Sequence, residues 1–155
     1  MSVRDQPIGR TTTARTAPVL LVEDDRDDEA LVLRALDSAE VRNPFVVAHD
    51  ADEAYAFLFG DAAAPPPPLP ALILLDLHLP GASGFDVLRR LRADPRTRLV
   101  PVILFTGSDR EEDVHEAYVL GANSFLRKPH DGAKLAELVV GWARYWLHLN
   151  EIAPI

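Results

Sequence analysis

Five short apolar runs, separated by segments of helical periodicity, constrain the fold of this chain more than any other feature of its sequence. The runs are residues 19–22, 45–48, 72–75, 102–105 and 124–126. Four of them are continuously apolar, which is typical of strands buried on both faces of a parallel sheet. Because strand and helix alternate five times, we expect right-handed crossovers and a doubly wound, five-stranded parallel sheet with five helices in three α/β/α layers.

Each apolar run is followed by a segment that predicts a helix. Amphipathic spacing or a capping signal places these helices at residues 27–39, 50–59, after Ser83, after Ser108 and at 131–149. Ser83 precedes Asp86 by three residues and Ser108 precedes Glu111 by three, which is the spacing of a capping box. We therefore expect the third and fourth helices to begin at these two serines.

The length of 155 residues predicts one domain, and we expect no second catalytic or DNA-binding domain. We expect a flexible arm at residues 1–17, which almost lack large apolar side chains, a folded domain at 18–149 and a tail at 150–155. No run approaches the roughly 20 apolar residues of a membrane span, and residues 1–17 contain no apolar core of a secretory signal. We therefore expect a cytoplasmic protein without membrane contact.

Net charge and cysteine content exclude further classes of function. The formal charge of −8 argues against general binding of nucleic acid or anionic membranes. The absence of cysteine excludes disulfides, thiolate zinc sites and thiol nucleophiles. Much of the negative charge lies in residues 23–29, which hold six acids and one arginine. The chemistry of this acidic segment therefore decides much of the function.

The connection before the third run is rich in proline. Residues 62–70 read Ala-Ala-Ala-Pro-Pro-Pro-Pro-Leu-Pro, which favours neither helix nor sheet and predicts a stiff polyproline-II spacer. A tolerated loop insertion is the favoured interpretation of the prolines at 65–70, because lengthening a loop costs little free energy. A ligand for a proline-binding domain is the alternative.

Ligands of open α/β sheets bind beyond the carboxyl ends of the strands, so the residues that follow each run are candidates for the functional site. The first run is followed by Glu23, Asp24 and Asp25, the third by Asp76, the fourth by Thr106 and the fifth by Lys128. Carboxylates, a hydroxyl and an ammonium group therefore converge at one edge of the predicted sheet.

These groups together indicate a specific chemistry. Clustered carboxylates repel one another unless a hard cation lies among them, and oxygen ligands without Cys or His favour Mg²⁺. A carboxylate beside such a cation can act as a nucleophile and form an aspartyl phosphate. Lys128 would balance the phosphoryl charge, and Thr106 would donate a hydrogen bond to a phosphoryl oxygen. Asp76 could instead be a turn residue, but burying it beside Glu23 and Asp24 without a cation would be unfavourable.

Four motifs extend this pattern to most of the chain. They are Leu-Leu-Val-Glu-Asp-Asp at 20–25, Leu-Leu-Asp-Leu-His-Leu-Pro-Gly at 74–81, Phe-Thr-Gly at 105–107 and Lys-Pro at 128–129. Together they resemble the receiver domain of two-component response regulators, which has a CheY-like, flavodoxin-type fold. The resemblance covers residues 18–149, and it implies that Asp76 accepts a phosphoryl group from a sensor histidine kinase.

The resemblance also implies roles for the neighbouring residues. Mg²⁺ would be held by Glu23, Asp24, Asp76 and the backbone carbonyl of His78, and the phosphoryl group would be bound by Thr106, Gly107 and Lys128. Thr106 and Phe125 would form the conformational switch, although Phe125 can equally be a core aromatic. His78 and Ser108 would flank the phosphoryl group and tune its hydrolysis, and Lys128–Pro129 would be a cis peptide.

One departure from the family pattern and one simpler interpretation limit what the resemblance implies. Glu23 stands where the family more commonly has Asp, and we expect it to bind the metal through water. The four further acids of the first segment are favoured as helix N-terminal residues stabilised by the helix dipole rather than as ligands; they are Asp25, Asp27, Asp28 and Glu29.

The last predicted helix has an apolar stripe wider than one buried face needs. Leu135, Leu138, Trp142, Tyr145 and Leu149 follow helical spacing, and Val139 and Trp146 widen the stripe. We predict a symmetric homodimer through Leu138, Trp142, Tyr145, Trp146 and Leu149, as in the regulators of phytochrome-type kinases that the chain resembles. The alternative is that the sheet covers the whole stripe.

Three classes of function follow from these residues. The favoured one is a single-domain response regulator that accepts its phosphoryl group from a histidine kinase such as a bacteriophytochrome and signals through protein contacts. It would catalyse its own phosphotransfer and dephosphorylation without being an enzyme in the usual sense. The second is a pseudo-receiver that only binds a partner. The third is a phosphohydrolase of the haloacid-dehalogenase type, which would require an acid two residues after Asp76, where this chain has His78.

Overall fold

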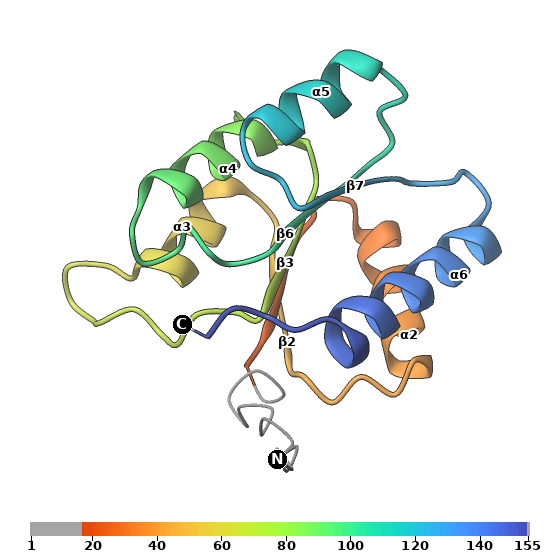
Figure 1. The fold of residues 1–155 in the computed structure, drawn as a ribbon, viewed down its shortest axis with the longest axis horizontal. Coiled ribbons are helices and arrows are strands. Elements are labelled where there is room, and N and C mark those ends of the chain that lie inside the picture. Colours follow the sequence, from red (N-terminus) through yellow and green to blue (C-terminus); the bar gives the residue numbers. More distant parts are fainter. Residues whose placement is uncertain (1–16, 155) are drawn as a thin grey trace, which may run out of the picture.

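Five parallel strands form the central sheet of the computed structural model, which describes residues 17–154 (Figure 1). The strands are β1 Val19–Val22, β2 Phe45–Ala48, β3 Leu72–Leu75, β6 Val102–Thr106 and β7 Ser124–Arg127. Their order is β2-β1-β3-β6-β7, so the chain crosses from one half of the sheet to the other after β2. The predicted fold class is confirmed, and β6 and β7 each run one residue further than predicted.

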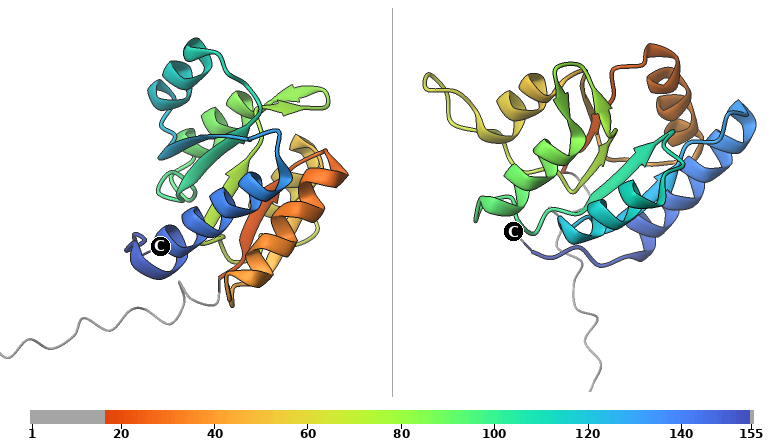
Figure 2. Two further views of the ribbon diagram at one scale, coloured as in Figure 1. Left: turned by 90° about the vertical axis from the view of Figure 1, so that its right-hand side faces the viewer. Right: turned by 90° about the horizontal axis from the view of Figure 1, so that it is seen from above.

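Helices cover both faces of this sheet, which gives the three predicted layers (Figure 1). The helices are α2 Arg26–Ser38, α3 Ala51–Phe59, α4 Gly84–Ala93, α5 Glu111–Val119 and α6 Gly132–Ala143. Helices α2 and α6 pack side by side on one face, and α3, α4 and α5 lie on the other (Figures 1 and 2).

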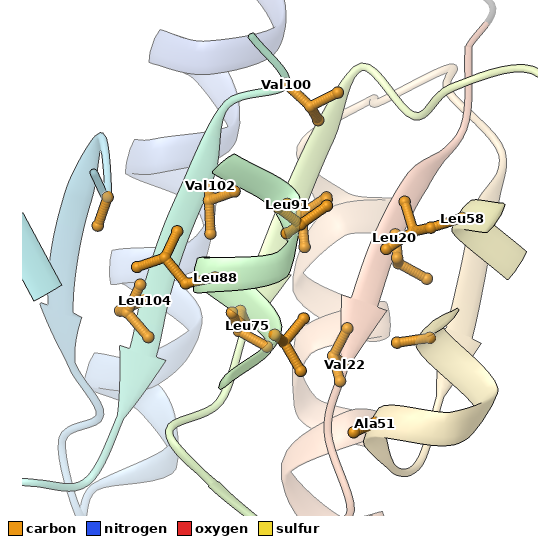
Figure 3. Packing of buried hydrophobic residues seen from close by; sticks show 14 of the residues in the cluster. Leu20, Val22, Ala51, Leu58, Leu75, Leu88, Leu91, Val100, Val102 and Leu104 are labelled. Carbon is orange, nitrogen blue, oxygen red and sulfur yellow. The ribbon is translucent and has the colours of Figure 1, made fainter. Parts of the chain in front are cut away.

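The continuous apolar runs are explained by burial on both faces. Successive side chains of a strand point to opposite sides, so Leu20 and Val22 pack under α3 and α4 while Val19 and Leu21 pack under α2 and α6. Figure 3 shows the first of these layers. Leu88 and Leu91 of α4 are fully buried against it. The two cores together fix the strands, and with them the positions of the strand ends.

One of the two predicted helix starts is correct. Ser83 caps α4, because its Oγ accepts the N–H of Phe85 at 3.1 Å while Asp86 Oδ2 accepts the N–H of Ser83 at 3.3 Å. The prediction that Ser108 caps the next helix is wrong: α5 begins at Glu111 after Arg110, whose side chain makes no cap hydrogen bond. Ser108 Oγ instead donates to Asp113 and accepts the N–H of Arg110 at 3.3 Å.

A small hairpin between β3 and α4 was not predicted. Strands β4 (His78–Leu79) and β5 (Ala82–Ser83) pair antiparallel around a turn in which Gly81 has φ of 71° (Figure 2). The hairpin returns the chain so closely that a Cβ on Gly84 would overlap with the carbonyl oxygen of Asp76. Glycine is therefore required at the first position of α4.

The proline-rich loop at 65–70 lies in neither helix nor strand. It extends from the side of the domain (Figure 2), and Arg96 of the α4–β6 connection donates to the carbonyl of Pro67 at 2.9 Å and to that of Leu58. Pro70 is buried where the loop enters β3. This anchoring agrees with a loop insertion that is held by the domain.

The last predicted helix is divided. Helix α6 ends at Ala143 and continues as a π-helical segment, η1 Arg144–Leu149, after which residues 150–154 are irregular. Among the described residues, no helix is long and apolar enough to cross a bilayer. The predicted arm at 1–17 lies outside the described residues except for its last one, and so does the end of the predicted tail at 155.

Candidate functional site

The register of the sheet brings the predicted strand-end residues together. Val22 is paired with Leu75, so Glu23 and Asp76 follow neighbouring strands at the same height. The backbone ladder continues through these residues: the N–H of Asp76 donates to the carbonyl of Val22 at 3.0 Å. At the same end of the β6–β7 pair, the N–H of Lys128 donates to the carbonyl of Thr106 at 2.8 Å. The site therefore stands on the rigid end of the sheet.

Three carboxylates form the acidic part of the site. Glu23, Asp24 and Asp76 each place an oxygen within 4.8 Å of the others, with Glu23 and Asp76 buried and Asp24 exposed. Burial, and after it the negative charge of Asp76, raise the pKa of Glu23 from 4.5 to about 7, although the charge and hydrogen bond of Lys128 and the hydrogen bond from the N–H of Asp25 lower it. Such a set of hard oxygen donors fits a divalent cation of the Mg²⁺ type.

Lys128 supplies the positive charge at the centre of the site. Its Nζ donates to Glu23 Oε2 at 2.6 Å, to Asp76 Oδ2 at 3.0 Å and to Asp28 Oδ2 at 3.0 Å. Burial by itself disfavours the ammonium, but these three carboxylates outweigh burial and hold the pKa of Lys128 above its ordinary value. Asp28 was expected to be only a helix N-terminal acid, so its contact with Lys128 is a feature that the sequence did not reveal.

The remaining predicted residues lie on β6, on β7 and on the β4–β5 hairpin. Thr106 is fully buried, and its Oγ1 accepts the N–H of Ser108 at 3.4 Å across Gly107. The N–H of His78 donates to Asp76 Oδ1 at 3.2 Å, and the His78 side chain is exposed. Phe125 is partly buried and packs against the core under α4 and α5.

One implication of the resemblance is wrong for this structure. The described residues contain no cis peptide bond, so Lys128–Pro129 is trans.

A cavity of about 800 Å³ opens beside Asp76 between the β4–β5 hairpin and the β6–α5 connection. His78 and Ser83 line it from the hairpin side, and Ser108 and Asp113 line it from the other. The N–H of His78, which lines the cavity, donates to Asp76 Oδ1 at 3.2 Å, so the cavity lies next to the backbone that holds the Asp76 carboxylate.

The apolar stripe of α6 is divided between core and surface. Leu138 and Trp146 are partly buried against the core under α2 and α6, whereas Tyr145 is 53% and Leu149 69% exposed. Trp142 is buried in the same core, so the prediction that it lies on an interface is wrong. Within the described part of the chain, its Nε1 is the buried side-chain polar atom that has no hydrogen-bond partner.

Known proteins are similar to this chain in sequence and in structure. The family model for the response regulator receiver domain matches residues 19–140. The response regulator Rcp1 of Synechocystis sp. is 35% identical over 129 residues, which cover 83% of this chain and 88% of that protein.

Solved structures agree with the sequence comparison. The Mn²⁺-bound form of Rcp1 is 33% identical and superimposes with a TM-score of 0.84 over 89% of this chain and 99% of that chain. The phosphorylated cyanobacterial phytochrome response regulator RcpA is 31% identical, with a TM-score of 0.80 over 90% of this chain and 99% of that chain. The bacteriophytochrome response regulator RtBRR is 38% identical, with a TM-score of 0.67 over 90% of this chain and 85% of that chain.

Proposed function

Because this chain belongs to the response regulator receiver domain family, we propose that Asp76 is the residue on which it accepts a phosphoryl group from a sensor histidine kinase. One observation carries this proposal: Asp76 lies in the acidic cluster with Glu23 and Asp24 and 3.0 Å from the Lys128 ammonium, at the end of β3, the strand that pairs with β6 and its Thr106. Glu23 shares the cluster and the Lys128 contact, but it follows β1, which does not pair with β6. A carboxylate so placed has a cation-binding group on one side and a charge-balancing group on the other.

The proposed reaction is a displacement at phosphorus. An oxygen of the Asp76 carboxylate attacks the phosphorus of a phosphohistidine, the P–N bond breaks, and its electron pair stays on the imidazole nitrogen, which takes up a proton from solvent. Lys128 offsets the charge of the phosphoryl group, while the Thr106 hydroxyl and the N–H of Gly107 donate to its oxygens. Thr106 and Phe125 then transmit the phosphorylated state to the surface.

We also propose that the site takes Mg²⁺, held by Glu23, Asp24, Asp76 and the backbone carbonyl of His78. Three hard oxygen donors gathered within 4.8 Å support this, and burial together with the charge of Asp76 raises the pKa of Glu23 to about 7, so that a cation would stabilise the ionised carboxylate there. A bound Mg²⁺ would supply positive charge that stabilises the negative charge on the attacking carboxylate oxygen and on the phosphoryl oxygens. That Rcp1 has a Mn²⁺-bound form supports the same chemistry here.

Hydrolysis of the aspartyl phosphate is proposed to depend on His78 and Ser108. His78 lies on the hairpin beside the cavity, where its side chain limits the approach of water to Asp76. Ser108 lines the same cavity, and its hydroxyl is bound to Asp113. Both side chains therefore lie where a hydrolytic water would enter.

The proposed phosphotransfer is tested with acetyl phosphate and intact-mass measurement. Wild type should gain one phosphoryl group in the presence of Mg²⁺ and none after chelation, and Asp76→Asn should gain none. Asp109→Asn, which removes an exposed acid near the same edge, should behave as wild type. A wild type that gains no phosphoryl group with Mg²⁺ would favour the pseudo-receiver.

The family assignment and the assembled site count against the two alternative functions, the phosphohydrolase and the pseudo-receiver. A phosphohydrolase of the haloacid-dehalogenase type is not supported, because the chain matches the receiver family and has His78 where that enzyme class needs an acid. The pseudo-receiver is opposed by the assembled set of Asp24, Asp76, Thr106 and Lys128.

We propose that this protein is cytoplasmic and that its partners are a sensor histidine kinase of the bacteriophytochrome type and a second copy of this chain, without nucleic acid or membrane contact. The exposed Tyr145 and Leu149, with Leu138 and Trp146 beside them, form the proposed homodimer surface on α6 and η1. The likeness to phytochrome response regulators supports the kinase class.

Sedimentation at tens of micromolar protein, the range of weak interfaces, tests the dimer. Wild type should sediment as a dimer, and Tyr145→Glu combined with Leu149→Glu as a monomer. Tyr118→Glu, an equally exposed tyrosine on α5, is the control and should stay dimeric. A monomeric wild type contradicts the proposed interface.

A further inference from the structure

The first turn of α2 contributes a carboxylate that the proposed phosphotransfer has not used. Asp28 Oδ2 lies 3.0 Å from Lys128 Nζ. The turn is held in place by Asp25, whose Oδ1 accepts the N–H groups of Asp27 and Asp28 at 2.9 and 3.0 Å. Asp28 is therefore aimed at Lys128 by the cap of its own helix.

The three contacts of Lys128 use its full donor capacity. A lysine ammonium has three N–H donors, and here Glu23, Asp28 and Asp76 each accept from Nζ at 2.6 to 3.0 Å. A phosphoryl oxygen on Asp76 would need one of these donors. A phosphoryl group on Asp76 brings several anionic oxygens to Lys128, so it competes for the ammonium with the carboxylates that already accept from it.

Solvent exposure shows which carboxylate is released at least cost. Phosphorylation turns Asp76 itself into the acyl phosphate, so the competing carboxylates are Glu23 and Asp28; the side chain of Glu23 is 1% exposed and cannot exchange Lys128 for water. The Asp28 side chain is 27% exposed. A carboxylate that loses its partner costs least where water can replace it, which singles out Asp28.

We propose that Asp28 is a positioning residue that holds the Lys128 ammonium in the unphosphorylated state and competes with the phosphoryl group for it. This inference rests on the proposed phosphorylation of Asp76. Asp28 also opposes phosphorylation directly, because Oδ2 of Asp28 and Oδ2 of Asp76 each lie 3.0 Å from the same nitrogen, no more than about 6 Å from one another. At that distance the Asp28 charge repels an incoming phosphoryl dianion.

The expected effect follows from Coulomb's law. With an effective dielectric constant between about 20 and 80, removing one charge at about 6 Å changes an equilibrium or rate by about threefold to 100-fold, and we expect about tenfold. Asp28→Asn should therefore be phosphorylated about tenfold faster by acetyl phosphate, with Mg²⁺ at a concentration that saturates each variant.

Three controls separate this role from a structural one. Asp27→Asn removes the same charge from the same turn of α2, but the structure, over the residues that it describes, shows Asp27 exposed and without a hydrogen bond to Lys128. The Asp27→Asn protein should therefore be phosphorylated at the wild-type rate. Asp28→Glu keeps the charge and should restore the wild-type rate. Phosphoramidate carries less negative charge than acetyl phosphate, so Asp28→Asn should accelerate its reaction less, and added salt should reduce both effects.

A second measurement does not depend on phosphorylation. In EDTA, a double-mutant cycle of Asp28→Asn and Lys128→Met should show a coupling of about twofold or more in the folding equilibrium constant. The same cycle with Asp27→Asn should show none.

The possible outcomes distinguish this inference from the proposed function. If wild type and Asp28→Asn both take up phosphoryl groups, but Asp28→Asn reacts no faster than Asp27→Asn, the inference is overturned and the proposed function stands. If no variant is phosphorylated, both are overturned, and a coupling measured in EDTA then reports a structural ion pair alone.

Discussion

The buried carboxyl of Glu23 makes the stability of the metal-free protein depend on pH in an unusual direction. Burial and the charge of Asp76 raise the pKa of Glu23 to about 7 in the folded state, against 4.5 in the unfolded chain. Below pH 4.5 both states hold the proton. Between pH 4.5 and about 7 the unfolded chain releases the proton while the folded protein keeps it, so the stabilisation present at low pH is lost as pH rises.

The size of this loss follows from the two pKa values. The gap between 4.5 and about 7 corresponds to about 3 kcal/mol, because a tenfold change in a proton-binding constant is worth about 1.4 kcal/mol. Other carboxylates titrate in the same range, so the quantity to measure is the difference between Glu23→Gln and wild type. In EDTA, the free energy of unfolding of Glu23→Gln should rise by about 3 kcal/mol relative to that of wild type as the pH increases from 4.5 to 8.

Urea unfolding followed by tryptophan fluorescence measures this difference across the pH range. Glu137→Gln, which changes an exposed glutamate of α6, is the control and should follow wild type at every pH. Added Mg²⁺ should stabilise wild type more at pH 8 than at pH 5.5, because it binds the ionised carboxylates. Parallel curves for wild type and Glu23→Gln would refute the raised pKa.

Four further substitutions test other parts of the structure. Gly84→Ala places a Cβ against the Asp76 carbonyl and 2.9 Å from Leu77 Cα, so it should lower the free energy of unfolding, measured in urea, by about 3 kcal/mol. Gly141→Ala is the control: its Cβ enters open space on an exposed helix face, so it should raise the free energy of unfolding by about 1 kcal/mol. Arg96→Ala leaves the carbonyls of Leu58 and Pro67 without their donor, and should cost about 2 kcal/mol and speed proteolysis within residues 61–70; unchanged proteolysis would contradict this anchoring. His78→Ala should shorten the half-life of the aspartyl phosphate several-fold by opening the cavity to water, and an equal half-life would refute the proposed role of His78.

The fold was predictable because its signals are local and repeated. Continuous apolar runs such as 72–75 report burial on both faces, and Ser83 with Asp86 reports the start of α4. Ser108 carries the same signal with Glu111 but does not cap α5, because its hydroxyl is bound to Asp113 instead. Whether a capping sequence caps therefore depends on competing partners that the spacing does not show.

The strand-end set was also predictable, because parallel strands place their carboxyl ends at one edge. Glu23, Asp76 and Lys128 meet there as expected. The role of Asp28 was not predictable, since an acid in the first turn of a helix is explained by the helix dipole alone. Its contact with Lys128 joins residues 100 positions apart and appears only when α2 and β7 are placed in space.

Burial along α6 could not be read from periodicity alone. The stripe predicts which residues share a face, but not where the core ends along the helix. Trp142 lies inside the core and Tyr145 outside it, although they are only one turn apart. The change to a π-helical turn at Arg144 alters the direction of the side chains that follow, and no residue pattern in this sequence signals it.

Chemical trapping shows directly whether Asp76 itself becomes phosphorylated. Sodium borohydride reduces an aspartyl phosphate to homoserine, so the protein is treated with acetyl phosphate and Mg²⁺, reduced, digested and sequenced by tandem mass spectrometry. We predict homoserine at position 76 and at no other aspartate, and no homoserine when Mg²⁺ is chelated. Homoserine at another aspartate, or its absence at position 76 in a sample that has gained a phosphoryl group, would contradict the account.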